Sequence, residues 1–305
     1  MPQLRTPTPR IPTIHDTNLA NETVTEFIRK HKGKLLVITG AGVSTDSGIP
    51  DYRSKQGVYV RNPNHRPILY HELIADELTR QRYWVRGYLG WKDMAKAQPN
   101  ATHIALARLI QEQHVSHLIT QNVDHLHHTA GTPPRKIVEL HGSLFEVECL
   151  DCRHTESRDG YQQRLSALNP QWASFDYSTV TVNPDGDVNL GDVSYHDFRI
   201  PSCQHCQSSM MKPKVIFFGE SIPKAVHAQA EAMVRQADAV LVIGSSLATY
   251  SSFRLVKMAH DWGKPVGMLN EGATRADDLT TFKVHAKCLP VLEHAMNTLL
   301  FAQQQ

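Results

Sequence analysis

The sequence predicts an α/β protein built on one open, mostly parallel sheet, with a second, smaller lobe. Short β-rich apolar runs alternate with segments long enough to be helices, which is the pattern of a parallel sheet covered by helices. A glycine-rich turn follows the first run, and two long excursions interrupt the alternation. We therefore expect a Rossmann-like, doubly wound sheet, and a smaller lobe made of the two excursions.

Six apolar runs are the expected strands: residues 34–39, 115–120, 136–140, 214–218, 239–243 and 265–269. About 75 residues separate the first two runs, far more than one crossover helix needs, so residues 53–99 should form a helical insert. The second excursion, residues 145–211, carries four of the five cysteines and the strong turn signal Asn183-Pro184-Asp185-Gly186.

These boundaries divide the chain into a main domain, residues 28–298, with a short segment at each end. Its Rossmann-like lobe should comprise residues 28–52, 100–144 and 212–298. Residues 1–27 are expected to form an arm, disordered at its start, because Pro2, Pro7, Pro9 and Pro12 oppose the amphipathic helix of a transit peptide. Residues 299–305 should be a C-terminal tail.

Composition predicts a soluble globular protein. The 305 residues hold 32 Lys and Arg against 30 Asp and Glu, and a net charge of +2 gives no electrostatic case for binding nucleic acid or membrane. No stretch approaches the roughly 20 apolar residues that span a bilayer, and no secretory signal is evident. We expect a cytoplasmic protein, or one of the mitochondrial matrix if the source is a eukaryote.

The glycine-rich turn reads Gly40-Ala41-Gly42-Val43-Ser44 and suits close approach of a pyrophosphate to the backbone. Thr45 replaces the third glycine of a dinucleotide fingerprint, and no acid ends the next strand. By itself, the turn fits a nucleotide site and an ordinary strand-to-helix turn about equally. Gly244-Ser245-Ser246 and Asn270 end later strands and could add polar groups, although loop chemistry explains each of them singly.

Two Cys-x-x-Cys pairs supply the four thiolates of a closed, structural zinc site, the ligands being Cys149, Cys152, Cys203 and Cys206. Fifty residues separate the pairs, more than the 15 to 20 of common ribbons, so the intervening segment must loop out. The alternative is four reduced thiols without metal. Four protein ligands leave no open position, so the ion should stabilise the lobe and not catalyse.

Six motifs in order resemble those of the sirtuin family. They are residues 40–53 (GAGVSTDSGIPDYR), Gln121-Asn122-Val123-Asp124, His141-Gly142, the cysteine pairs, Phe218-Gly219-Glu220 and Gly244-Ser245-Ser246. The resemblance extends from about residue 28 to 298 and is closest to the class II, mitochondrial lipoamidase/deacylase-like branch. It implies an NAD-dependent protein lysine deacylase that transfers the acyl group to ADP-ribose, releases nicotinamide, and thereby consumes NAD+.

The resemblance assigns roles by motif position. Asn122 would contact the ribose and His141 would be the general base, since a neutral imidazole near pH 7 suits removal of a ribose hydroxyl proton. The other histidines, including His125, His127 and His128, are expected to be surface or core residues. The implied NAD contacts are Gly40, Ala41, Gly42, Thr45, Asp51, Tyr52, Arg53, Gln121, Asn122, Val123, Asp124, Gly244, Ser245, Ser246, Asn270, Glu271, Gly272 and Cys288. For Cys288, a buried structural thiol is an equal alternative.

Tyr83 and Arg86 are three residues apart and would share a helix face. Sirtuins that remove succinyl or glutaryl groups carry a similar pair, in which phenol and guanidinium hold the distal carboxylate. The resemblance thus implies a preference for negatively charged acyl groups, against the alternative of an ordinary amphipathic helix. The acyl-lysine peptide would lie extended between Phe218-Gly219-Glu220 and the segment after Ser246.

Two other functions remain open at this point. A mono-ADP-ribosyltransferase would pass the same activated ribose to a protein nucleophile, and the mass of the products would separate it from an acyl transferase. A non-catalytic, NAD-binding zinc module is a different class of protein. The presence of Asn122, Asp124 and His141 argues against that module. A conventional dehydrogenase is disfavoured by the missing third glycine and ribose acid.

Overall fold

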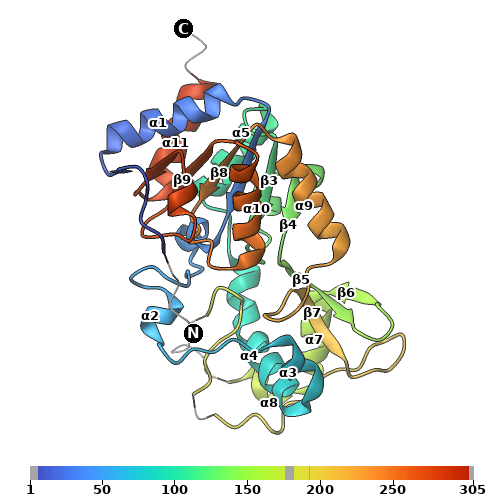
Figure 1. Cartoon of the computed structure of the whole chain (residues 1–305). Helices are drawn as coiled ribbons and strands as arrows, with labels where there is room; N and C mark the ends of the chain where they lie inside the picture. The colour runs from blue at the N-terminus through green and yellow to red at the C-terminus, as the bar shows by residue number, and fades with distance from the viewer. Residues whose placement is uncertain (1–5, 176–181, 192, 302–305) are drawn as a thin grey trace.

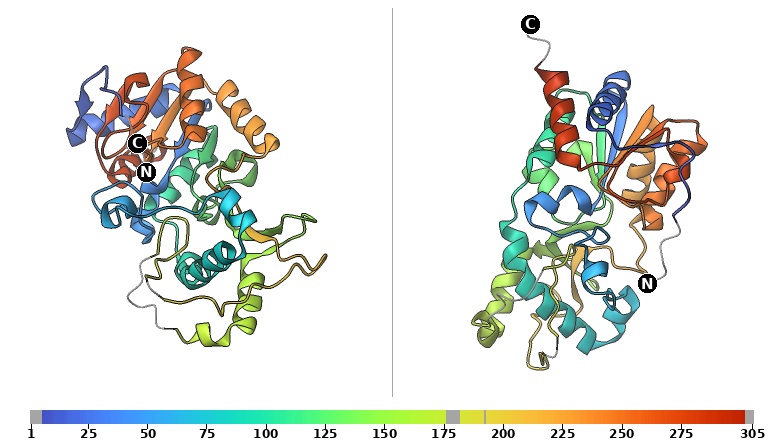
Figure 2. Two further views of the ribbon diagram at one scale, coloured as in Figure 1. Left: turned by 60° about the horizontal axis from the view of Figure 1, so that its bottom comes forward. Right: turned by 90° about the vertical axis from the view of Figure 1, so that its left-hand side faces the viewer.

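The computed structural model describes residues 6–175, 182–191 and 193–301 and has two lobes. A large lobe holds the main sheet and the helices that cover it, and a smaller lobe holds a short sheet and the helical insert (Figure 1). The two lobes remain distinct in two further views (Figure 2). The α/β fold with a smaller inserted lobe is confirmed.

The main sheet has seven parallel strands in the order β1-β10-β9-β8-β2-β3-β4. β2 (Leu35–Thr39) and β8 (Ala239–Ile243) lie at its centre, and all ten of their residues are buried. Such continuous apolar runs are expected for strands that are covered on both faces. The other strands are β1 (Thr13–Ile14), β3 (His117–Thr120), β4 (Ile137–Glu139), β9 (Val266–Leu269) and β10 (Phe282–Val284).

Two helical layers cover the sheet. Leu35 and Val37 of β2 point into a core shared with α1 (Thr17–Lys30), α5 (Ala101–Gln111) and α11 (Cys288–Leu300). Leu36 and Ile38 point into the opposite core, shared with α9 (Lys224–Gln236) and α10 (Tyr250–Asp261). Because side chains alternate along a strand, one apolar run serves both layers.

The strand order reverses between β2 and β8. From β2 the sheet continues to β3 and β4, and from β8 it continues to β9 and β10 in the other direction. Open α/β sheets bind ligands outside the carboxyl ends of strands at such a switch point. The loops after β2 and β8 are therefore where a site is expected, and the first of them holds two short 3-10 helices, Ala41–Val43 and Thr45–Ser47.

The smaller lobe combines the two inserted segments. The first contributes α2 (Val58–Arg61), α3 (Tyr70–Ala75) and α4 (Glu77–Lys96). The second contributes β5 (Gly142–Cys149), β6 (Thr155–Ser157), α7 (Arg158–Leu168) and α8 (Pro170–Ala173), and it ends at β7 (Met211–Val215). The order β6-β5-β7 gives a small antiparallel sheet. Remaining short elements are α6 (Leu126–Thr129) and 3-10 helices at Pro134–Lys136 and Asp277–Leu279.

Two expectations about the elements are wrong. The run at residues 214–218 is not a strand of the main sheet: the strand there is β7, which ends at Val215 and pairs with β5 of the smaller lobe. Residues from Thr13 to 27 are not a free arm, since β1 pairs with β10 and α1 packs on α11. Ala20, Val24 and Phe27 of α1 are buried there, because its apolar residues recur at helical spacing.

No helix among the described residues is both long and apolar enough to cross a bilayer.

Candidate active site

The loops after β2 and β8 pack backbone against backbone. The amide of Gly42 donates to the carbonyl oxygen of Gly244 at 2.9 Å. A Cβ on Gly40 would lie 2.7 Å from the Ser245 Cβ, and one on Gly42 would lie 2.9 Å from the Gly244 oxygen. Gly244 itself has a φ of 61°, which favours glycine. Both glycines of the first turn are thus required by contact between the two loops.

A buried hydrogen-bonded chain joins Asn122, Ser44 and Asp124. The Asn122 Nδ2 donates to Ser44 Oγ at 3.0 Å and to the Gly40 carbonyl oxygen at 3.2 Å. Ser44 Oγ donates in turn to Asp124 Oδ2 at 2.6 Å, and the amide of Leu126 donates to Asp124 Oδ1. Burial raises the pKa of the Asp124 carboxyl, while these two hydrogen bonds oppose that rise. Two of the predicted NAD contacts, Asn122 and Asp124, are therefore joined through Ser44.

Gln121 directly follows β3, and His141 lies two residues beyond the end of β4. Its Nδ1 is 3.0 Å from the Gln121 carbonyl oxygen, and its Nε2 is 2.8 Å from Ser251 Oγ. A carbonyl can only accept, so Nδ1 carries the proton and the Nε2 lone pair accepts from the serine hydroxyl. The side-chain Nε2 of Gln121 donates to Ser245 Oγ at 2.8 Å, which ties the site to the β8 loop.

Burial lowers the pKa of His141 to about 4, against a smaller opposing effect of the hydrogen bond to Gln121. The imidazole is therefore neutral at pH 7, as a general base must be. Nε2 of His141 is therefore the unprotonated nitrogen, and it faces Ser251.

The predicted NAD contacts at residues 51–53 lie on a turn that is fixed by the Asp51 carboxylate. Asp51 Oδ1 accepts from the amides of Arg53 and Ser54, at 3.0 and 2.8 Å. Tyr52 stacks on Tyr59, and the Arg53 guanidinium lies 5.2 Å from the centre of the Tyr59 ring. These contacts place Asp51, Tyr52 and Arg53 on one compact turn after the glycine-rich segment.

Further predicted nucleotide contacts lie on neighbouring loops. Thr45 Oγ1 donates to the Gly42 carbonyl oxygen, and the carbonyl oxygen of Val123 accepts from the amide of Leu144. Ser246 contributes its carbonyl oxygen to the amide of Arg275. Ala41 opens the first 3-10 helix.

At the end of β9, the Asn270 side chain donates to the carbonyl oxygen of Glu271 at 2.9 Å, so part of its hydrogen-bonding capacity serves its own loop. Gly272 follows with a φ of 90°. Cys288 begins α11, and burial raises the pKa of its thiol to about 12, with the Glu271 carboxylate adding to the effect. A thiol with that pKa is protonated and unreactive at neutral pH.

Tyr83 and Arg86 lie on α4, both buried. Arg86 Nη2 is 2.6 Å from Asp187 Oδ2, and its Nε donates to the carbonyl oxygen of Val188 at 2.7 Å. Burial, and next the Asp187 carboxylate, raise the pKa of Asp185 to about 7. The guanidinium therefore already holds one carboxylate of the chain, and a second acid lies close by.

The segment predicted to pair with a peptide is partly exposed. Phe218 is exposed, its carbonyl oxygen accepts from the amide of Tyr70, and Gly219 follows with a φ of 83°. Glu220 is held by the buried Lys212, whose Nζ lies 3.3 Å from Glu220 Oε1. The Glu220 side chain thus fixes the turn from within.

The four paired cysteines come together in the smaller lobe, their sulfur atoms all within 4.8 Å of one another. The Sγ atoms of Cys149 and Cys206, and those of Cys152 and Cys203, are 3.6 Å apart. Sulfur ligands about 2.3 Å from a tetrahedral zinc ion lie roughly 3.8 Å from one another, so the arrangement fits such an ion. Backbone amides, that of Cys206 first, lower the pKa of the Cys203 thiol to about 7. The predicted ligand set could therefore hold one zinc.

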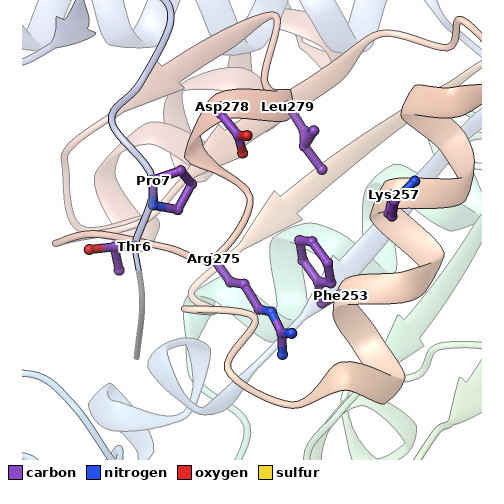
Figure 3. A pocket seen from close by; sticks show the side chains of 7 residues that line it. All are labelled: Thr6, Pro7, Phe253, Lys257, Arg275, Asp278 and Leu279. Atoms are coloured by element: carbon purple, nitrogen blue, oxygen red, sulfur yellow. The ribbon is translucent and has the colours of Figure 1, made fainter. Parts of the chain in front are cut away.

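A surface hollow is lined by side chains from α10 and from the segment after β9 (Figure 3). Arg275 and Phe253 line it, with the guanidinium 4.5 Å from the centre of the phenyl ring, and Thr6 and Pro7 border it from the N-terminal segment. No residue that the sequence assigned to a site lines it.

Sequence reasoning missed four polar residues of the site. Ser44 and Ser251 contact Asp124 and His141, while Asp185 and Asp187 surround Arg86. Ser44 is the last residue of the glycine-rich turn, and its hydroxyl is a signal that could have been used. The other three lie far along the chain from their partners, and no local pattern reveals them.

The family model described as "Sir2 family" matches residues 40–251. The chain is 41% identical to "NAD-dependent protein deacylase SIR4" of Batrachochytrium dendrobatidis (strain JAM81 / FGSC 10211), over 90% of this chain and 92% of that protein. It is 44% identical to "NAD-dependent protein deacylase Sirt4" of Drosophila melanogaster, over 86% of this chain and 82% of that protein.

Two solved structures have a similar overall fold. One, described as "Structural Basis for the Mechanism and Regulation of Sir2 Enzymes", matches with a TM-score of 0.71 at 26% identity, over 92% of this chain and 98% of that chain. Another, described as "Sir2-p53 peptide-NAD+", matches with a TM-score of 0.68 at 26% identity, over 89% of this chain and 95% of that chain.

Proposed function

We propose that this chain, which belongs to the Sir2 family and is an NAD-dependent protein deacylase, prefers lysine acyl groups that end in a carboxylate. The products would be nicotinamide, deacylated lysine and O-acyl-ADP-ribose. The observation that carries the deacylase chemistry is the connected cluster of Asn122, Ser44, Asp124, Gln121 and His141 at the switch point of the sheet.

The catalytic roles follow from that cluster. NAD+ supplies an activated ribose whose bond to nicotinamide is broken. Asn122 and Gln121 would hold the ribose, and the buried Asp124 carboxylate would orient the departing amide, a positioning effect. His141 Nε2 would accept the proton of a ribose hydroxyl, and such bases typically contribute about 100 to 10,000-fold to the rate. Ser251, which donates to that nitrogen, would be displaced by the ribose hydroxyl.

The remaining predicted nucleotide contacts would surround this centre. Asp51, Tyr52 and Arg53 would lie over the leaving group, on the turn that the Asp51 carboxylate fixes. Asn270 and Cys288 would lie at the other end of the nucleotide. The peptide would pair with the backbone of residues 218–220, where the Phe218 side chain is exposed.

Zinc would hold the smaller lobe together. The four thiolates fill the coordination sphere of a tetrahedral ion, so no position is left for substrate. Cys149 ends β5 and Met211 begins β7, and these two residues are paired in the small sheet. The metal would thus fix the register of the strands on which the second insert is built.

The acyl preference rests on Arg86 and its surroundings. The guanidinium forms an ion pair with the carboxylate of Asp187, and a succinyl or glutaryl group would offer the same kind of carboxylate. Asp187 would therefore act as an internal competitor, which leaves the guanidinium when a substrate carboxylate enters. The raised pKa of Asp185 means that this second acid would carry less negative charge at pH 7, and so would repel the substrate less.

The test compares succinyl-lysine and acetyl-lysine peptides. A hydrogen bond to a charged group contributes about 1.5 to 3 kcal/mol, so Arg86→Met should lower the succinyl-to-acetyl ratio of kcat/KM by roughly 10 to 100-fold. Because that change alone leaves the buried Asp187 carboxylate without its cationic partner, Arg86→Met is combined with Asp187→Asn. Mass analysis of peptide and nucleotide products provides both rates.

Asp187→Asn alone supplies the matched comparison. If Asp187 competes with substrate, this variant should raise the succinyl-to-acetyl ratio while the double variant lowers it. Equal changes in kcat/KM for both acyl groups in all variants would refute the carboxylate preference. Removal of the acetyl group by the parent protein would still support the deacylase chemistry.

A further inference from the structure

A second group of metal-ligating side chains lies beside the catalytic strand ends and has no role in the chemistry above. His125 Nδ1 is 3.2 Å from Glu139 Oε1, and His128 Nε2 is 3.8 Å from the same oxygen. Their ligand atoms all lie within 4.8 Å of one another. We propose that His125, His128 and Glu139 bind a divalent transition-metal ion of the zinc, cobalt and nickel class.

The fold brings these three side chains together. His125 directly precedes α6, and His128 follows three positions later, which places both on one face of the first turn. Their rings stack with centroids 4.4 Å apart and an interplanar angle of 24°, so the two rings would turn about their side-chain torsions to aim one nitrogen each at a shared ion. Glu139 is the last residue of β4 and points its carboxylate at both rings. The cluster thus joins two elements that are separated in sequence.

The spacing fits a metal ion. Nitrogen and oxygen ligands about 2.1 Å from a tetrahedral zinc ion lie roughly 3.4 Å from one another, between the two distances seen here. Two imidazoles and one carboxylate form the donor set that zinc, cobalt and nickel accept, whereas magnesium and calcium require oxygen ligands. Three protein ligands also leave a position for water, so this ion would exchange more readily than one held by four cysteines.

The backbone and the exposure support a binding site. His125 has a φ of 60°, an uncommon conformation for a residue other than glycine, and such residues cluster at functional sites. The side chains of His125, His128 and Glu139 are 38%, 19% and 18% exposed, so an ion can reach them from solvent. An ion here would tie the segment after Asp124 to the strand end before His141.

The experiment is a cobalt titration of the protein, without a polyhistidine tag, while it retains the metal bound by its cysteines. Calorimetry should detect one Co²⁺ ion bound per chain. The absorption spectrum of the complex should show weak visible bands typical of nitrogen and oxygen ligands. Mutation of residues that only hydrogen-bond to a metal ligand typically lowers metal affinity by about 10 to 100-fold. Removal of a direct ligand by His128→Gln should therefore weaken Co²⁺ binding by about tenfold or more. His125→Asn with His128→Gln should abolish it.

Two controls make the result decisive. Asn accepts a positive φ, so His125→Asn should keep the backbone, and unchanged circular dichroism will verify the fold. His227 lies 3.7 Å from Glu231, but among the described residues it belongs to no group of three metal-ligating side chains, so His227→Ala should bind Co²⁺ as the parent protein does. No binding, equal binding by the double variant, or an intense near-ultraviolet thiolate-to-cobalt band in place of the visible bands would each overturn the proposal.

Discussion

His103 should make the protein sensitive to mild acid. It is fully buried, its Nδ1 accepts from the amide of Asn100 at 3.3 Å, and its ring packs against that of His127. Burial lowers its pKa from 6.5 to about 4. As the pH falls from 6.5 to 4, His103 is protonated in the unfolded chain but not in the folded chain. The free energy of unfolding therefore decreases across that pH range.

The magnitude follows from the two pKa values. A difference of about 2.5 corresponds to about 3 kcal/mol once the pH has fallen below 4, with about 2 kcal/mol of it already lost at pH 5. His103→Gln removes the titration and keeps the helix cap, because Gln at the third helical position can accept the same backbone amide.

The assay is the free energy of unfolding in urea at pH 7.5 and pH 5. His103→Gln should lose about 2 kcal/mol less than the parent protein between these pH values, whatever its stability at pH 7.5. His196→Gln, a change at an exposed histidine, is the control and should follow the parent. Parallel losses in the parent and in His103→Gln would refute the reasoning, because zinc loss or another histidine would then explain the acid sensitivity.

Three further predictions concern the metal, the site and the loop contact. Cys203→Ser should remove the bound zinc and lower the melting temperature, whereas Cys288→Ser should keep one zinc per chain by atomic absorption; equal zinc contents would contradict the ligand assignment. Ser44→Ala removes a donor to a buried carboxylate, so kcat/KM for nicotinamide release should fall by roughly 10 to 100-fold, and an unchanged value would exclude the role. Gly42→Ala would drive a Cβ against the backbone after β8 and should lower the melting temperature, while Gly87→Ala on α4 meets open space and should not; similar effects would count against loop contact.

The sequence predicts the parts of this fold that depend on local pattern. Buried strands such as β2 and β8 are continuous apolar runs, and the two cysteine pairs have few uses besides metal binding in a reducing compartment. The prediction for residues 214–218 is wrong because the sheet to which a strand belongs depends on its pairing partner, which a local pattern does not reveal. Its apolar run resembles a central strand, but β7 ends at Val215 and belongs to the small sheet through its pairing with β5.

Short edge strands carry too little signal to be predicted. β1 has two residues, and β10 includes Lys283, whose buried ammonium lies 2.6 Å from Asp277. A lysine interrupts the apolar pattern of a buried strand, and the sequence does not show that an ion pair with Asp277 allows it to be buried. The same limit applies to the site, because the bond between Arg86 and Asp187 joins residues 101 positions apart and leaves no trace in either local sequence.

The central claim is that acyl removal is coupled to NAD+ cleavage through His141. The most direct measurement is the ratio of nicotinamide, deacylated peptide and O-acyl-ADP-ribose formed from one acyl-lysine peptide, for the parent protein and for His141→Ala. The parent should form the three products in equal amounts, and His141→Ala should form O-acyl-ADP-ribose about 100-fold or more slowly. Nicotinamide release with ADP-ribose attached to protein, or an unchanged rate in His141→Ala, would contradict this account.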